Sequence, residues 1–448
     1  MKVWGFLAYL IICLHTTMLS VPSQMAALCK LKYIHFSRKD IDYLRDHKKK
    51  FCILNFLPSD WMGGVESCVI AQHDIMHRAL HFKSLMFVCH ESPVQKNLFL
   101  SQLPHYSSHA DKLRKYDFGL YQRTLSEQIR KLCIRHNVDI IHCHKPYHLE
   151  LLRNAIAGLQ VKLVLMYHGS KIPESDYPAF KNLDGIIAVN LNAKHLIEQA
   201  NQLYQLDIKN IVQIFPPFNE KKFLNYKPIH GSRKEFFKQT YACDIGQAPL
   251  ICNIGNFYGP AIKPEDKGFV FEKNQEVLIK ALYILIHERK KKVQALFVGD
   301  GPNRVWHEQL SKQLNLAKHI HFLGFCNEIH KILSYIDIHV LPSHEESVGI
   351  ATLEASLMKK PSIGSSGTGS EQTIVHNQTG FIFNNNDAND LADKLEQLID
   401  NPELRMTMGN NACKYVTNRN NFGRPNAQFT QEAIFKKLST FYKRLIMS

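Results

Sequence analysis

The fold of this chain is decided by the stretch Leu341-Pro342-Ser343-His344-Glu345-Glu346-Ser347-Val348-Gly349-Ile350-Ala351-Thr352-Leu353-Glu354-Ala355. Glu346 and Glu354 are eight positions apart, and Gly349 lies between them. The pattern predicts a loop that carries Glu346, a helix that begins near Gly349, and Glu354 on the second turn of that helix. Because the first turn of a helix has N–H groups without intrahelical partners and the positive end of the helix dipole, this segment can bind an anion.

On both sides of this stretch, short apolar runs alternate with longer amphipathic ones, which predicts parallel strands joined by helices. The expected strands are residues 51–56, 85–89, 140–143, 162–167, 185–189 and 211–214 in the first half, and 250–254, 293–298, 320–322, 338–341, 362–364 and 380–383 in the second. The expected helices are residues 65–80, 121–136, 149–157, 274–288, 303–314 and 327–335. We therefore predict an α/β protein with two doubly wound, Rossmann-like domains, whose ligands bind at the carboxyl ends of the strands.

The predicted domain boundaries follow changes in composition. An apolar leader covers residues 1–29, the first domain 45–225, the second domain 245–425, and a C-terminal helix 426–448. The turn-prone, charged stretch 216–248 is the expected linker. In the leader, the apolar run 3–14 is shorter than the roughly 20 residues that span a bilayer, and no well-formed cleavage site follows it. A signal peptide and a membrane-associating arm both stay open.

The charge balance restricts the partners of the chain. The 448 residues carry a formal charge of +15, which favours anionic partners such as nucleotide phosphates or the surface of an anionic membrane. No arginine-rich run, zinc-finger spacing or aromatic RNA-binding signature is present, so a nucleic-acid partner is not expected. None of the 11 cysteines forms a Cys-x-x-Cys pair, so we expect no metal site and reduced thiols, typical of a cytoplasmic enzyme.

Polar residues follow several expected strands. Gly63-Gly64-Val65-Glu66 comes after the first strand and opens a helix, where glycines allow a ligand to approach the backbone closely. His142 and His144 lie at the end of another strand, and His168 follows the next one. His142 and His144 are candidates for an acceptor cleft, although hydrogen-bonded core histidines fit the same pattern.

Taken together, these motifs resemble the retaining family-four glycosyltransferases of the GT-B fold. The pair of glutamates is followed by the family's downstream residues, which are Ala355, Lys359-Lys360-Pro361, Gly364, Glu371 and Thr379-Gly380-Phe381. The resemblance implies an acceptor domain and a nucleotide-sugar donor domain with a cleft between them, and a C-terminal helix that crosses back onto the first domain. It also implies transfer of a sugar from a nucleoside diphosphate, with UDP the expected nucleotide, to a hydroxyl of a glycan or lipid. No metal or other cofactor is expected, and polysaccharide or lipopolysaccharide biosynthesis is the expected setting.

The resemblance also assigns roles to individual residues. It implies that Glu346 and His168 contact the transferred sugar, that Lys273 neutralises the diphosphate, and that Glu354 binds the ribose. The other positions that the resemblance places at the donor are Gly63, Gly64, Gly255, Asn256, Gly349, Ile350 and Ala351.

Two departures from the family pattern qualify this reading. Asn256 stands where the family has an arginine, and a long loop, 257–272, follows it. Lys263 and Lys267 of that loop are candidate substitutes for the missing cation. Thr368 also replaces the second glycine of a common Gly-Gly pair. A degenerate, non-catalytic nucleotide-sugar-binding protein and an epimerase with the same fold therefore remain as alternatives.

Overall fold

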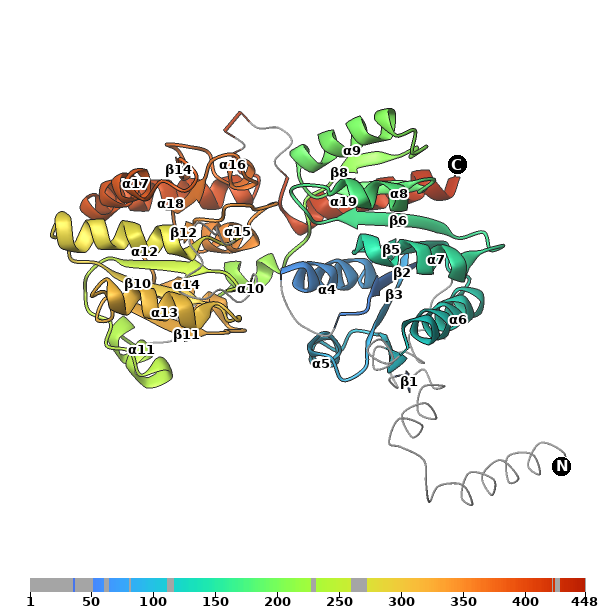
Figure 1. Ribbon diagram of the computed structural model, residues 1–448, viewed down its shortest axis with the longest axis horizontal. Helices are drawn as coiled ribbons and strands as arrows, with labels where there is room; N and C mark the ends of the chain where they lie inside the picture. The colour runs from blue at the N-terminus through green and yellow to red at the C-terminus, as the bar shows by residue number, and fades with distance from the viewer. Residues whose placement is uncertain are drawn as a thin grey trace, which may run out of the picture. The chain divides into compact units, whose positions relative to one another are not determined.

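The computed structural model describes residues 35–36, 51–59, 64–79, 82–110, 117–226, 231–258, 272–420, 422–423 and 428–447. Within these ranges the chain forms two sheets, each flanked by helices (Figure 1). The apolar leader and Lys263 and Lys267 lie outside the described residues, as does Gly63. None of the helices in these ranges is long and apolar enough to cross a membrane.

The first sheet has eight strands in the order β1-β4-β3-β2-β5-β6-β7-β8. The recorded pairings are parallel except that of β1 with β4, which is antiparallel. Its strands are β1 (His35–Phe36), β2 (Phe51–Leu57), β3 (Phe82–Cys89), β4 (Tyr106–Ser108), β5 (Ile140–Cys143), β6 (Lys162–Tyr167), β7 (Gly185–Ala188) and β8 (Ile211–Gln213). The helices between them are α4 (Gly64–His77), α5 (Pro93–Leu100), α6 (Phe118–His136), α7 (Leu149–Ile156), α8 (Tyr177–Phe180) and α9 (Leu191–Leu203).

The second sheet has six parallel strands in the order β11-β10-β9-β12-β13-β14. They are β9 (Leu250–Ile254), β10 (Gln294–Val298), β11 (Ile320–Gly324), β12 (Ile338–Leu341), β13 (Ser362–Ser365) and β14 (Gly380–Phe383). The helices are α12 (Gln275–Tyr283), which continues as the π-helical turn η4 (Ile284–Glu288), α13 (Arg304–Gln313), α14 (Ile329–Tyr335), α15 (Ile350–Leu357), α16 (Ser370–Thr373), α17 (Ala388–Asp400) and α18 (Pro402–Val416).

The strand order of the second sheet locates its ligand site. From β9 the chain runs outward to β10 and β11, and then returns to the other side of β9 with β12. The order therefore reverses between β9 and β12, and ligands of such sheets bind at the carboxyl ends of the strands at this switch point. The loops that leave these two strands begin at Gly255 and at Pro342, so the Glu346 segment leaves the sheet at the switch point.

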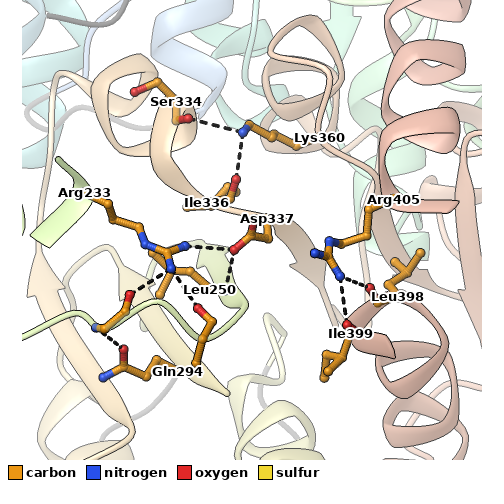
Figure 2. Close-up of polar contacts among 12 residues, drawn as sticks. Arg233, Leu250, Gln294, Ser334, Ile336, Asp337, Lys360, Leu398, Ile399 and Arg405 are labelled. Atoms are coloured by element: carbon orange, nitrogen blue, oxygen red, sulfur yellow. Dashed lines mark hydrogen bonds and ion pairs between the residues drawn. The ribbon is translucent and has the colours of Figure 1, made fainter. Parts of the chain in front are cut away.

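The predicted two-sheet α/β architecture is confirmed, and the predicted linker turns out to contain helices. These are α10 (Glu220–Leu224) and α11 (Arg233–Tyr241). Arg233 fastens α11 to the start of the second sheet, as Figure 2 shows. Its guanidinium donates to Asp337 Oδ2 (2.9 Å) and to the carbonyls of Gly246 (2.8 Å) and Ala248 (2.9 Å). The same Asp337 oxygen accepts from the N–H of Leu250 (2.8 Å), the first residue of β9. The domain boundaries themselves stay a prediction.

Arg233→Ala should lower the free energy of unfolding by about 2–3 kcal/mol, because charged hydrogen bonds in a partly buried site are lost and Asp337 loses its cationic partner. Only 16% of the Arg233 side chain is exposed. Its neighbour Lys234 is the matched control, since its ion pair with Asp244 spans 3.5 Å and is far more exposed. Lys234→Ala should change stability by less than about 0.5 kcal/mol. Denaturant unfolding measures both variants, and equal losses would contradict a specific role for Arg233.

The C-terminal helix is α19 (Gln431–Met447), and it packs against the first sheet. A Cβ at Gly185 in β7 would lie 2.6 Å from Cζ of Phe441, so the absence of a side chain at this glycine makes room for the helix. Gln72 of α4 also donates to the hydroxyl of Tyr442 at 3.4 Å. These residues belong to one compact unit, which comprises Ser67–Ile75, His144–Pro146 and Val164–Ser448.

Candidate functional site

The loops that follow β9 and β10 come into contact through glycines. The N–H of Gly255 donates to the carbonyl of Val298 at 2.9 Å. Gly299 has a φ of +141°, and a Cβ there would lie 2.1 Å from the carbonyl oxygen of Gly255. Only glycine fits at this position. The segment Gly299-Asp300-Gly301-Pro302 therefore shapes the backbone beside Gly255 and Asn256.

Lys273 and Glu346 form an ion pair at this edge of the second sheet. Lys273 lies just before α12, and its Nζ is 3.0 Å from Glu346 Oε2 and 3.2 Å from Glu272 Oε1. Burial disfavours the ammonium, but the two carboxylates outweigh this effect and raise the pKa of Lys273 above its usual value. The Lys273 side chain is 24% exposed, so the cation remains within reach of a ligand.

The carboxylate of Glu346 is held by its own loop. Ser343 Oγ donates to Oε2 at 3.3 Å, and the N–H of Ser347 donates to Oε1 at 3.1 Å. The N–H of Gly369 donates to the backbone carbonyl of Glu346 at 2.8 Å. A Cβ at Gly369 would lie 1.9 Å from the carbonyl oxygen of Ser347, so the loop rests directly on this glycine. These contacts fix the carboxylate without a ligand.

The start of α15 offers free backbone amides. Gly349 precedes the helix with a φ of +76°, and a Cβ there would meet Leu341 Cδ2 at 2.7 Å. No side chain caps this end of the helix. Among the described residues, none accepts a hydrogen bond from the N–H of Ile350 or Ala351. The helix start predicted near Gly349 is confirmed, and it leaves two donors and the positive end of the dipole for an anion.

Glu354 lies on the second turn of α15, as predicted, and is half-buried. Burial raises its pKa to about 7, and the charge of Lys222 opposes this effect. No side chain or backbone N–H of the described residues donates to the Glu354 carboxylate. A carboxylate in this state can accept hydrogen bonds from the hydroxyls of a ligand.

The first sheet carries the other predicted residues. His168 follows β6, and its Nε2 is 3.2 Å from Nδ1 of His144, which follows β5. Burial and the charge of Lys145 lower the pKa of His168 to about 3, so its imidazole is neutral at physiological pH. His142 is fully buried within β5, where a core role fits it better than contact with an acceptor.

The Gly-Gly-Val-Glu segment places Gly64 exposed at the first position of α4. Glu66 of the same segment is buried and accepts a hydrogen bond from Ser59 Oγ at 2.9 Å, which ties the helix start to the end of β2. The carboxylate of this motif therefore supports the loop.

Two residues that depart from the family pattern have structural roles. The backbone carbonyl of Asn256 accepts a hydrogen bond from Gln275 Nε2 at 3.1 Å, which fixes the loop end to α12. Thr368 Oγ1 donates to the carbonyl of Ser365 at 2.9 Å and accepts from the N–H of Ser370 at 3.2 Å. Thr368 thus closes the turn before α16.

Lys360, a member of the downstream motif, donates to the carbonyls of Ser334 and Ile336, next to the end of α14 (Figure 2).

The second-sheet residues predicted from sequence thus belong to loops and a helix start that meet at the switch point. Sequence reasoning missed Ser343 and Gly369, which hold the Glu346 loop. The signal that could have pointed to Gly369 is its position directly after Thr368, next to the family's Gly-Gly pair. Among the residues that the structure describes, no three His, Cys, Asp or Glu side chains form a group that could hold a metal ion.

Comparisons with known proteins support this picture. The model of the family described as "Glycosyl transferases group 1" matches residues 267–415, which include Lys273, Glu346 and Glu354. A putative glycosyltransferase of Bacillus subtilis, EpsD, is 24% identical over 67% of this chain and 78% of the relative. The N-acetyl-alpha-D-glucosaminyl L-malate synthase of Bacillus anthracis is 25% identical over 80% of this chain and 88% of the relative.

Solved structures share the fold. A glycosyltransferase from Rickettsia africae aligns with a TM-score of 0.70 at 21% identity, covering 89% of this chain and 99% of that one. Anabaena HepE in complex with UDP-glucose aligns with a TM-score of 0.69 at 18% identity, covering 88% of this chain and 99% of that one. The family match over residues 267–415, which include β10 to β14, and the shared fold identify the chain as a GT-B glycosyltransferase similar to the glycosyl transferases group 1 family, whose members are retaining enzymes.

Proposed function

We propose that the chain transfers a sugar from a UDP-linked donor to a hydroxyl of a glycan or lipid-linked acceptor, with retention of the anomeric configuration. The observation that carries the proposal is the Lys273–Glu346 pair beside the uncapped start of α15, at the switch point of the second sheet. The complexes of HepE with UDP and with UDP-glucose support the choice of nucleotide.

The diphosphate of the donor would bind at the start of α15. The N–H groups of Ile350 and Ala351 would donate to phosphate oxygens, and Lys273 would neutralise the charge that builds as the diphosphate leaves. Fixed donors aimed at developing charge are the largest contribution to rate in many enzymes. The ribose hydroxyls would donate to the Glu354 carboxylate, which accepts no hydrogen bond from a described residue.

The transferred sugar would be oriented by Glu346 and His168. Glu346, already fixed by Ser343 and Ser347, would accept hydrogen bonds from sugar hydroxyls. Neutral His168 would donate from the ring nitrogen that does not face His144. The bond from the anomeric carbon to the diphosphate oxygen breaks, and a bond to the acceptor oxygen forms on the same face. The acceptor proton passes to the departing phosphate oxygen, so the step needs no separate base.

One relative supports the proposal of a lipid-linked acceptor. A GDP-mannose-dependent phosphatidylinositol monomannoside mannosyltransferase of Mycobacterium tuberculosis is 21% identical over 71% of this chain and 80% of that protein. Its name describes a lipid-linked acceptor and a GDP-linked donor, so GDP-sugars belong in the same screen as UDP-sugars. A donor present at 100 times its Kd should add about 2.7 kcal/mol to the stability of the protein. Thermal unfolding across nucleotide sugars would identify it.

A non-catalytic nucleotide-sugar-binding protein is the second candidate, because Asn256 replaces the family's arginine. Release of nucleoside diphosphate from the identified donor, measured with and without acceptor, separates the two. Binding without release would favour the second candidate. A change in the nucleotide sugar itself, seen by chromatography against the epimeric standard, would instead indicate an epimerase.

Glu354→Gln should weaken nucleoside diphosphate binding by about 10-fold or more, because an amide replaces a carboxylate that accepts charge-assisted hydrogen bonds. The pKa of Glu354 is about 7, so the carboxylate is mostly protonated at about pH 6 and mostly ionised at about pH 8. The ionised form binds ribose hydroxyls better, and wild-type affinity should therefore rise with pH across this range.

Calorimetry on wild type and Glu354→Gln at both pH values measures this effect. The phosphate of the nucleotide titrates in the same range, but it does so for both proteins, so the difference between them reports Glu354. A pH dependence that survives unchanged in Glu354→Gln would remove Glu354 from the ribose site.

A further inference from the structure

A cavity lies along one face of α19. Its volume is about 790 Å³, within the range of about 300–1,000 Å³ typical of small-molecule sites. One face of α19 forms its wall, and β8 and the end of α18 close it. All of these elements lie in the same compact unit, from Val164 onward. None of the residues assigned to the donor lines this cavity.

Three cations line the cavity, and their side chains have no partner among the described residues. They are Lys436, Lys437 and Arg444, and none of their side chains makes an ion pair or hydrogen bond with another described residue. Lys437 and Arg444 are seven residues apart, which places them on the same face of α19, about 10 Å apart along its axis. Lys436 and Arg444 are two turns apart on that face. The basic side chains thus form a stripe along the cavity wall.

The carboxylates of the cavity do not neutralise this stripe. Glu432 lies one turn before Lys436 at the start of α19, but no ion pair joins them. Glu220 accepts a hydrogen bond from the N–H of Gln431 at 3.3 Å, so its carboxylate is used at the helix start. Both acidic groups lie toward the N-terminal end of the helix, and the other charged residues of the lining are the three cations.

Lys437 is the cation for which an anion would matter most. Its side chain is half-buried, and this burial lowers its pKa because no acidic group compensates for the lost water. An anion that enters the cavity would supply the negative charge that Lys437 lacks nearby. Arg444 has the fork of donors that binds phosphate oxygens in pairs.

We propose that this cavity binds a phosphorylated ligand through Lys436, Lys437 and Arg444. The phosphate group belongs either to a free phosphorylated metabolite or to the headgroup of an anionic phospholipid. The site is independent of the proposed donor site, since it shares no residue with it.

Binding of inorganic pyrophosphate to the full chain tests the proposal. Titration calorimetry would compare wild type, Lys437→Gln/Arg444→Gln, and a control with the same loss of charge outside the cavity, Lys414→Gln/Lys443→Gln. Lys273→Ala serves as a further background, because pyrophosphate can also bind at the donor diphosphate site. In this background, the cavity variant should bind pyrophosphate at least about tenfold more weakly, and the control should bind normally.

Sedimentation with vesicles distinguishes the two sources of phosphate. Vesicles of phosphatidylcholine with and without phosphatidylglycerol would be mixed with wild type, the cavity variant and the control. Retention on phosphatidylglycerol that the cavity variant alone loses identifies a phospholipid headgroup, whereas pyrophosphate binding without retention identifies a free metabolite. The proposal is overturned if wild type binds neither probe, or if the cavity variant and the control behave alike. Loss of donor binding in Lys273→Ala has no bearing on these results.

Discussion

Lys273→Ala should lower the rate of sugar transfer by about 10²–10³-fold, the usual cost of removing one group that stabilises transition-state charge. Among the described residues, Lys273 forms an ion pair with Glu346 at 3.0 Å, and Asn256 stands where the family has an arginine. The departing diphosphate would therefore lose its main cationic partner. Single-turnover measurements at saturating donor report this step directly.

The control for this variant is Lys280→Ala. Lys280 belongs to α12 and pairs with Glu276 at 2.6 Å, but that pair lies on the exposed face of the helix. Its loss should alter the rate by no more than about twofold, because such surface pairs contribute little. Lys273→Ala also leaves Glu346 without its partner, so thermal unfolding must accompany the kinetics. A rate loss that Lys273→Arg restores, with stability unchanged, identifies a cation requirement.

The inserted loop provides a sharper version of the same test. If Lys273 is the main cation, Asn256→Arg should raise or preserve the rate, and Lys263→Ala and Lys267→Ala should be mild. If a lysine of the loop has taken over, one of the two alanine variants becomes the damaging change. Should none of these variants differ from wild type while nucleotide still binds, the diphosphate binds elsewhere.

Glu346→Ala should reduce turnover by roughly 10- to 150-fold, which is what the loss of a charge-assisted hydrogen bond of about 1.5–3 kcal/mol amounts to. Its effect on the affinity for free nucleoside diphosphate should be much smaller, because the proposed contact is to the sugar. Glu345→Gln is the matched control, since the Glu345 side chain is 36% exposed and that of Glu346 only 11%.

Equal losses of rate and of nucleotide affinity in Glu346→Ala would assign Glu346 a structural role. This outcome is plausible on physical grounds, because the carboxylate also accepts from Lys273 and Ser343. Glu346→Gln preserves the size of the side chain and one acceptor oxygen. If Glu346→Gln folds normally and still loses turnover selectively, packing is not the explanation.

The sequence predicts the buried strands well and the peripheral elements poorly, for a physical reason. β9 and β12 are buried and appear as mainly apolar runs, interrupted only by Asn253 and His339. β4 has only three residues, Tyr106–Ser108, two of them serines, so no apolar run marks it. The 13-residue helix α9 is not among the helices named from the sequence, although Asn190 caps its start by accepting from the N–H of Ala193.

The candidate site shows the same division. Gly349 and the two glutamates are close in sequence, so their local pattern predicts a helix start with carboxylates around it. The partnership of Lys273 and Glu346 joins residues 73 positions apart, and only the resemblance placed both at one donor. The support from Gly369 depends on how closely two backbone segments approach each other in space. No local pattern in one sequence contains that information.

The preformed Lys273–Glu346 pair has a consequence for the end of the catalytic cycle. In the proposed reaction, the phosphates of a nucleoside diphosphate attract Lys273 and leave Glu346 without a new partner. The nucleoside diphosphate must therefore compete with Glu346 for Lys273. The intact donor also attracts Lys273, but its sugar hydroxyls donate hydrogen bonds to Glu346 and so replace the lost ion pair. On this proposal, the site would discriminate between the donor and the released nucleoside diphosphate through an exchange of partners that only the donor completes, which would favour release of the leaving nucleotide after each turnover.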